Sequence, residues 1–89
     1  MKIDAWCEIT VLSSGKTYFD ICVPVDCDYV RGDADDVITW IRNSKEIEAL
    51  CADEGLAESD LKISVLNLDE VVEEISYDEF ADKTQYSDV

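Results

Sequence analysis

Histidine is absent from the 89-residue chain, and lysine and arginine together number only seven against 22 aspartates and glutamates. Without histidine, the chain has neither a histidine-based catalytic triad nor a histidine metal ligand. With so few cations it has no basic patch that could neutralise phosphates or attract anionic lipids. The formal net charge of −15 therefore predicts that the protein repels DNA, RNA and membranes.

Long apolar runs are also missing, because no stretch approaches the roughly 18 consecutive apolar residues of a transmembrane helix. No secretory signal is recognisable, since Asp4 and Glu8 interrupt the apolar residues near the first lysine. We therefore expect a cytoplasmic protein that contacts no membrane. In that compartment the four cysteines are expected to be reduced and mostly sheltered.

Metal sites have little support in the sequence. The closest cysteines, Cys22 and Cys27, are separated by four residues instead of the two that are typical of zinc-binding pairs. An EF-hand loop starting at Asp26 fails at three of its five defining positions. We expect no metal and no cofactor.

Hydrophobic residues make up 47% of the chain and include two Trp, four Tyr and two Phe, which excludes the composition of a disordered segment. The length predicts a single acidic domain over residues 1–89, with residues 84–89 expected to be frayed. A domain of this size has little room for the water-excluding cleft that acid–base catalysis needs, and no catalytic motif is recognisable. We therefore expect that the protein is not an enzyme.

Residues 3–25 alternate between apolar and polar side chains on both sides of a short polar segment, which predicts a β-hairpin. A three-residue loop at 13–15, with Gly15 in the left-handed conformation, places both apolar sets on one face. The predicted cross-strand pairs are Ala5 with Val23, Trp6 with Cys22, Cys7 with Ile21, Glu8 with Asp20, Ile9 with Phe19, and Thr10 with Tyr18. This register places two carboxylates, Glu8 and Asp20, directly opposite each other. Because like charges in this position destabilise a sheet, we expect either that the sheet bends there or that this face has a function.

A helix is predicted from about residue 34 to residue 53. Asp33 is a favourable N-cap, and Gly55 is a favourable stop. Ser44 interrupts the apolar repeat, so the helical segment is either kinked or split there. The sequence does not decide between the two.

Leu61, Ile63 and Val65 alternate with polar residues and predict a third strand. The segment 68–75 fits either a helix or a strand that pairs back on the third, and its β-branched content favours the strand. The predicted fold is therefore α+β and ββαββ-like. In it, a small antiparallel sheet carries one helical segment packed on one face.

The magnitude of the charge is the remaining signal. A compact domain of this length has a radius of gyration near 12 Å and a diameter of about 30 Å, over which duplex DNA carries on the order of 18 phosphate charges. The net charge of −15 approaches that density. Since self-repulsion weakens the fold, so large a charge favours a selective use over simple solubility.

The acidic residues gather in two stretches. They comprise Asp26, Asp28, Asp33, Asp35 and Asp36 in the first, and Asp69, Glu70, Glu73, Glu74, Asp78, Glu79 and Asp82 in the second. In length, charge and a compact α+β core with such clusters, the whole chain resembles the small acidic inhibitors of phages and mobile elements, including DNA mimics and anti-CRISPR proteins. This resemblance implies an inhibitor that occupies the nucleic-acid-binding groove of a host defence complex, in the host cytoplasm if the protein is phage-encoded.

We therefore expect a non-enzymatic inhibitor that binds a basic nucleic-acid-binding protein or complex, such as a CRISPR effector, by presenting carboxylates in place of phosphates. It is not expected to bind nucleic acid itself. The candidate contact residues are Asp26, Asp28, Asp33, Asp35, Asp36, Asp69, Glu70, Glu73, Glu74, Asp78, Glu79, Trp6 and Tyr18. The alternative is a protein-interaction module or allosteric inhibitor that uses an aromatic patch of Trp6 and Tyr18, with the acidity serving solubility and steering.

Overall fold

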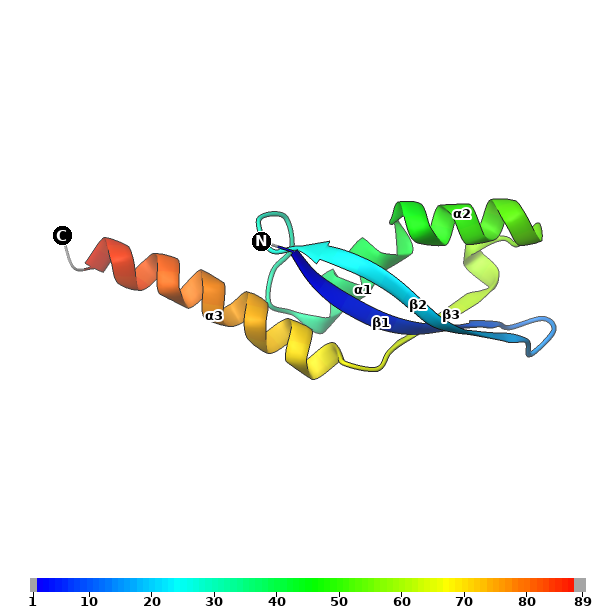
Figure 1. The fold of residues 1–89 in the computed structure, drawn as a ribbon, viewed down its shortest axis with the longest axis horizontal. Coiled ribbons are helices and arrows are strands. Elements are labelled where there is room, and N and C mark those ends of the chain that lie inside the picture. Colours follow the sequence, from blue (N-terminus) through cyan, green and yellow to red (C-terminus); the bar gives the residue numbers. More distant parts are fainter. Residues whose placement is uncertain (1, 88–89) are drawn as a thin grey trace.

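The computed structural model describes the backbone of residues 2–87 and the side chains of residues 2–77. Its elements are β1 (Lys2–Val11), β2 (Thr17–Asp26), α1 (Ala34–Arg42), α2 (Lys45–Glu54), a 3-10 turn (Glu58–Asp60), β3 (Leu61–Val65) and α3 (Leu68–Ser87). The strands form one antiparallel sheet in the order β2-β1-β3. The predicted α+β class is confirmed, whereas the ββαββ-like order with a single helix is not matched (Figure 1).

The core lies between one face of the sheet and the three helices. Alternate residues of β1 are buried, and they meet buried aliphatic side chains of the helices. The cluster includes Ala5, Cys7, Ile9 and Val11 of β1, Val23 and Val25 of β2, Val37 and Ile41 of α1, Ile47 of α2, and Val71 and Ile75 of α3. The opposite face of the sheet therefore carries no helix among the described residues.

The hairpin register is correct in its first half. Ala5 pairs with Val23, Trp6 with Cys22, and Cys7 with Ile21, while Gly15 has a φ of 74° in the turn. Beyond Cys7 the register shifts, because a bulge adds one residue to β2. Ile9 then lies opposite Tyr18 and Thr10 opposite Thr17, so the predicted pairs Glu8–Asp20, Ile9–Phe19 and Thr10–Tyr18 are wrong.

The bulge has a clear electrostatic reason. In the predicted register the carboxylates of Glu8 and Asp20 would stand directly opposite each other on one face. Instead, Asp20 adopts a left-handed backbone with a φ of 58°, a conformation that aspartate tolerates better than most residues. Glu8 remains paired on its other side with Ser64 of β3. In the observed register Glu8 has no one-to-one partner on β2, so the predicted direct opposition of the two carboxylates is not formed.

The predicted helix is split at Ser44 into α1 and α2. The Asp33 side chain accepts hydrogen bonds from the backbone N–H groups of Asp35 and Asp36, which confirms it as the N-cap of α1. The Ser44 hydroxyl donates to the Ile41 carbonyl and accepts from the backbone N–H of Ile47, so one side chain ends α1 and begins α2. Gly55 ends α2 with a left-handed φ of 65°.

The segment 68–75 is helical, so its assignment to a strand is wrong, and the sheet has three strands among the described residues. As a helix, the segment turns Val71 and Ile75 into the core while its carboxylates remain in water. A strand would have buried only every second residue and left Val72 on the solvent side. β3 pairs instead with the central strand β1.

The molecule is elongated, with dimensions of 55 × 20 × 18 Å and a radius of gyration of 15.0 Å. The expected value was about 12 Å for a compact domain of this length. Figure 1 shows the cause, since α3 extends away from the sheet at one end of the long axis and the hairpin turn lies at the other. The charge is therefore spread over a longer body than the sequence suggested.

Two of the cysteines, Cys7 and Cys27, are buried, while Cys22 and Cys51 are partly buried. Burial, reinforced by the neighbouring Cys22, raises the pKa of the Cys7 thiol from an ordinary 9.0 to about 11. Burial and then the nearby Asp4 raise the pKa of Cys22, and burial and then Glu58 raise that of Cys51. These three thiols are thus held in the protonated form, which is a poor nucleophile.

Stability is expected to fall as the pH rises from about 9 to about 11. Since the folded pKa of Cys7 lies above the unfolded value, the folded state keeps a proton that the unfolded state has lost in this interval. The stabilisation is fully present below pH 9, and each such proton contributes a slope of up to about 1.4 kcal/mol per pH unit above it. Urea denaturation across this range measures the slope, and a shallower slope in Cys7→Ala assigns it to Cys7. An identical slope in that variant would contradict the assignment.

Candidate functional site

The loop between β2 and α1 is built by its own aspartates. One carboxylate oxygen of Asp26 accepts from the backbone N–H of Asp28 at 3.1 Å, and one of Asp36 accepts from that of Arg31 at 2.9 Å. Asp33 caps α1 in the same way. Asp28 and Asp35 contribute their backbone N–H groups to this network and expose their side chains. Of the five predicted acidic residues in this loop, these two are therefore the ones whose carboxylates can be altered without removing a loop hydrogen bond.

The second acidic stretch lies on the outward face of α3. Leu68, Val71, Val72 and Ile75 occupy the inner face at helical spacing. The exposed positions are Asp69, Glu70, Glu73 and Glu74, followed by Tyr77. The side chains of the other predicted residues of this stretch, Asp78 and Glu79, lie outside the described residues, as does that of Asp82.

The tertiary fold brings the two acidic stretches together. The hydroxyl of Ser76 on α3 donates to the carbonyl of Gly32 in the loop at 3.3 Å. A Cβ on Gly32 would lie 2.9 Å from the Ser76 nitrogen and 3.0 Å from its Cα, so the loop and the helix touch where only glycine fits. Residues 26–36 and 69–74 thus share one region, here called the acidic surface. Two stretches that are more than 30 residues apart in the sequence form one candidate site.

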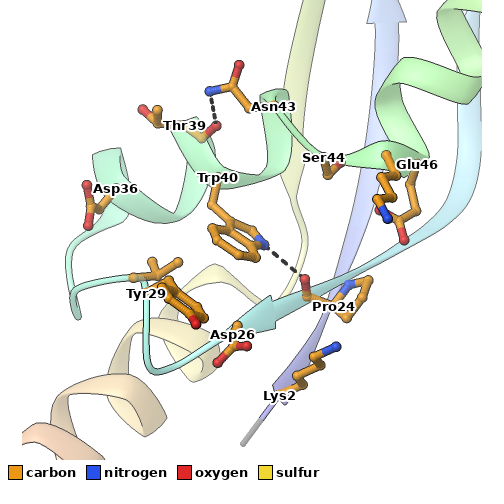
Figure 2. Close-up of a pocket in the computed structure, with 12 residues that line it drawn as sticks. Lys2, Pro24, Asp26, Tyr29, Asp36, Thr39, Trp40, Asn43, Ser44 and Glu46 are labelled. Atoms are coloured by element: carbon orange, nitrogen blue, oxygen red, sulfur yellow. Dashed lines mark hydrogen bonds between the residues drawn. The ribbon is translucent and has the colours of Figure 1, made fainter.

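A groove of about 580 Å³ opens beside this surface, between α1 and the end of β2 (Figure 2). Asp26 and Asp36 line it, together with Glu46 and two lysines, Lys2 and Lys45. The groove therefore presents carboxylates in a concave setting, where a bound side chain loses part of its water.

Two aromatic residues of this groove, Tyr29 and Trp40, were missed by the sequence analysis as functional residues. The indole N–H of Trp40 donates to the Pro24 carbonyl at 2.9 Å, and the Tyr29 ring stacks on the indole with centroids 6.3 Å apart and planes at 8°. Tyr29 is 76% exposed. The sequence did carry one signal for Tyr29, which is a tyrosine placed among several aspartates. It carried none for Trp40, because this residue fitted the apolar repeat of the predicted helix.

Two cations, Arg42 and Lys16, contact neutral groups outside the acidic surface. Arg42 donates to the backbone carbonyls of Glu58 and Leu61 at 3.2 and 3.5 Å. The Lys16 ammonium lies 4.8 Å from the centre of the Tyr18 ring. Within residues 26–36, Arg31 is the single cation in the sequence. The acidic surface therefore keeps most of its negative charge.

The structure does not bring Trp6 and Tyr18 together. Trp6 lies on the open face of the sheet opposite Cys22, and it is 46% exposed. The bulge places Tyr18 opposite the buried Ile9, so this tyrosine packs against the core on the other face. Both residues were predicted to share one aromatic patch, and the shifted register is the reason that they do not.

Other kinds of site find no support in the part of the chain that the structure describes. No group of three or more carboxylates or thiols there is arranged to hold a metal ion. None of the helices in the same part is long and apolar enough to cross a membrane. No protein-family model matches the chain, and comparison with curated proteins and with solved structures finds no significant similarity.

Proposed function

We propose that the protein is a non-enzymatic inhibitor that binds a basic nucleic-acid-binding protein and blocks access of DNA or RNA to it. The contact between Ser76 and Gly32 carries this proposal, because it joins two separate acidic stretches into one surface. Each exposed carboxylate presents oxygens to a lysine or arginine that otherwise contacts a phosphate. As in the acidic phage inhibitors that the chain resembles, the partner is a host defence complex such as a CRISPR effector, in the cytoplasm.

The extent of the mimicry follows from the dimensions. A duplex 55 Å long, matching the longest dimension of the protein, carries about 32 phosphate charges. The net charge of −15 is about half of that number. Mimicry of a whole duplex is therefore excluded by the magnitude, and the acidic surface replaces a short stretch of phosphates inside a binding cleft. Binding of this kind is fast at low salt and weakens steeply as ionic strength rises.

The experiment first identifies the partner by pull-down from a bacterial lysate and then tests direct competition. In a gel-shift assay with labelled DNA or RNA bound to the purified partner, added inhibitor is expected to release the nucleic acid. Formation of a ternary complex, with the nucleic acid still bound, would contradict the proposal.

Neutralising two carboxylates of the acidic surface is expected to weaken binding to that partner. In Asp28→Asn combined with Asp35→Asn, the hydrogen bonds of the loop and the Asp33 cap stay intact. Loss of two ion pairs of roughly 0.7 kcal/mol each raises Kd about tenfold at low salt. The dependence of log Kd on log salt should also become shallower. Titration at several salt concentrations measures both effects.

A matched control carries the same change in charge elsewhere. Asp53→Asn with Glu54→Gln neutralises two exposed residues at the end of α2. This variant is expected to keep nearly the full affinity, because long-range steering changes equally but no contact is lost. Equal weakening by both pairs would assign the binding to net charge alone and would contradict a defined acidic surface.

A further inference from the structure

The face of the sheet opposite the helices is open and carries large apolar side chains. Trp6 of the central strand is 46% exposed, and Leu66, just beyond β3, is 65% exposed. Since Cys7 pairs with Val65 in an antiparallel ladder, Leu66 lies directly beside Trp6 on the same face. Phe19 of β2 is 63% exposed. Because its neighbour Tyr18 faces the core, Phe19 points to the open face.

Specific hydrogen bonds hold Leu66 in place beside Trp6. The Leu66 backbone N–H donates to the Trp6 carbonyl at 2.8 Å. The side chain of Asn67 then bonds twice to β1, accepting from the Trp6 N–H and donating to the Asp4 carbonyl, both at 2.9 Å. The Asn67 side chain thus continues the hydrogen bonding between β3 and β1 beyond the last residue of β3. The two apolar residues are presented on rigid backbone, which lowers the entropy lost on binding.

The third apolar residue is presented by the bulge. Asp20 has a φ of 58°, an unusual backbone conformation for a residue with a side chain. Bulges are over-represented beside functional sites, where they redirect a side chain. Here the bulge turns Tyr18 inward and Phe19 outward.

A second copy of the chain fits this face poorly. Two strands of about 33 Å and a third of about 16 Å, spaced about 4.8 Å apart, give the face a projected area near 400 Å². A stable protein interface buries about 800 Å² on each partner. A second copy would also bring another net charge of −15 to the same small contact. The charge therefore argues against a homodimer, and the small area limits the contact with any other protein to a weak one.

The charges on this face favour a positively charged partner. Charged side chains at the outward positions of the register are Lys2, Asp4, Glu8, Asp26 and Lys62, and the exposed Asp20 lies in the bulge beside them. Carboxylates outnumber ammonium groups four to two there, within a molecule that is strongly negative throughout. We infer that this face docks a basic protein surface, with apolar side chains of the partner on Trp6, Phe19 and Leu66 and its lysines or arginines on the carboxylates. This contact lies on another face than the acidic surface of loop and α3, and the two share Asp26 alone.

Two synthetic peptides of equal length and charge test the inference. One alternates lysine with leucine and the other alternates lysine with serine, so only the first can cover the apolar side chains. The Lys–Leu peptide is expected to bind about tenfold more tightly, and the advantage is expected to persist at high salt. It should disappear in Trp6→Ser and, independently, in Leu66→Ser. Fluorescence anisotropy of labelled peptides measures the ratio, and circular dichroism establishes that each variant folds.

Controls separate this inference from the proposed function. Tyr77→Ser removes an aromatic side chain that is 75% exposed on α3 and should leave the ratio of the two affinities unchanged. Asp28→Asn with Asp35→Asn should weaken both peptides equally. Equal binding of the two peptides to the wild type, or a ratio unaffected by Trp6→Ser, overturns the inference. Sedimentation at high salt is expected to show a monomer, and a dimer disrupted by Trp6→Ser would assign the face to a second copy and also overturn it.

Discussion

Replacing Ile75 by alanine is expected to lower the free energy of unfolding by about 2–5 kcal/mol. The Ile75 side chain is fully buried and, together with that of Val71, packs the first part of α3 against the core. The loss comprises the transfer free energy of the removed carbons and the cavity that they leave. For a domain of this length, whose total stability is about 5–13 kcal/mol, such a change is large. Urea denaturation, analysed at constant m-value, measures it.

The neighbouring residues supply the control for this result. Glu74→Ala and Tyr77→Ala alter exposed side chains and should change stability by no more than about 0.5 kcal/mol. A strand over this segment would instead place Tyr77 on the same face as Ile75. Large losses in both Ile75→Ala and Tyr77→Ala, with no loss in Val72→Ala, would therefore contradict the helix.

Replacing Gly32 by alanine is expected to cost about 1–3 kcal/mol of stability and to weaken binding to the partner. The added Cβ would collide with the Ser76 hydroxyl and approach the backbone of α3 to 2.9 Å at the nitrogen. Alanine also reduces the entropy of the unfolded chain, which contributes up to about 1 kcal/mol in the stabilising direction. The steric term is larger because backbone atoms cannot move aside as a flexible side chain can. Thermal and urea denaturation measure the net effect.

A double-mutant cycle connects this loss to its cause. Ser76→Ala removes the hydroxyl that the new Cβ would meet, at the expense of the hydrogen bond to the Gly32 carbonyl. Gly32→Ala should therefore cost less in the Ser76→Ala background than in the wild type. Additive effects would assign the cost of Gly32→Ala to the backbone of α3, whereas no loss of stability in Gly32→Ala would show that the loop and α3 are not in contact there. The acidic surface would then be two separate patches.

Local chemistry made much of the fold predictable. The N-cap of α1 and the stop of α2 follow from Asp33 and Gly55, whose preferences depend only on neighbouring backbone groups. The first half of the hairpin register follows from the alternation around the Gly15 turn. Ser44 was recognised as an interruption, although its two hydrogen bonds were needed to show a complete break.

The candidate site was predictable in composition and not in arrangement. The sequence shows which residues are acidic, but not that Gly32 and Ser76 bring the loop and α3 together. The predicted register also placed Trp6 and Tyr18 on the same face, because the alternation of β2 was extended through a position where the chain bulges. The apolar group on the open face, with Phe19 and Leu66 beside Trp6, could be found only after the bulge and the Asn67 hydrogen bonds were seen.

The sequence by itself therefore determined the α+β class, the strong negative charge, the first half of the hairpin register, the third strand, the start of α1 and the end of α2. These properties depend on composition or on contacts between residues close in the chain. The tertiary structure alone decided the bulge at Asp20, the helical state of 68–75 and the central place of β1 in the sheet. Each of these depends on which apolar side chains reach a shared core and which carboxylates must avoid one another. These features depend on contacts between segments far apart in the sequence, which local propensities do not predict. For residues 68–75 the propensity of the β-branched residues even favours a strand, although the segment is a helix.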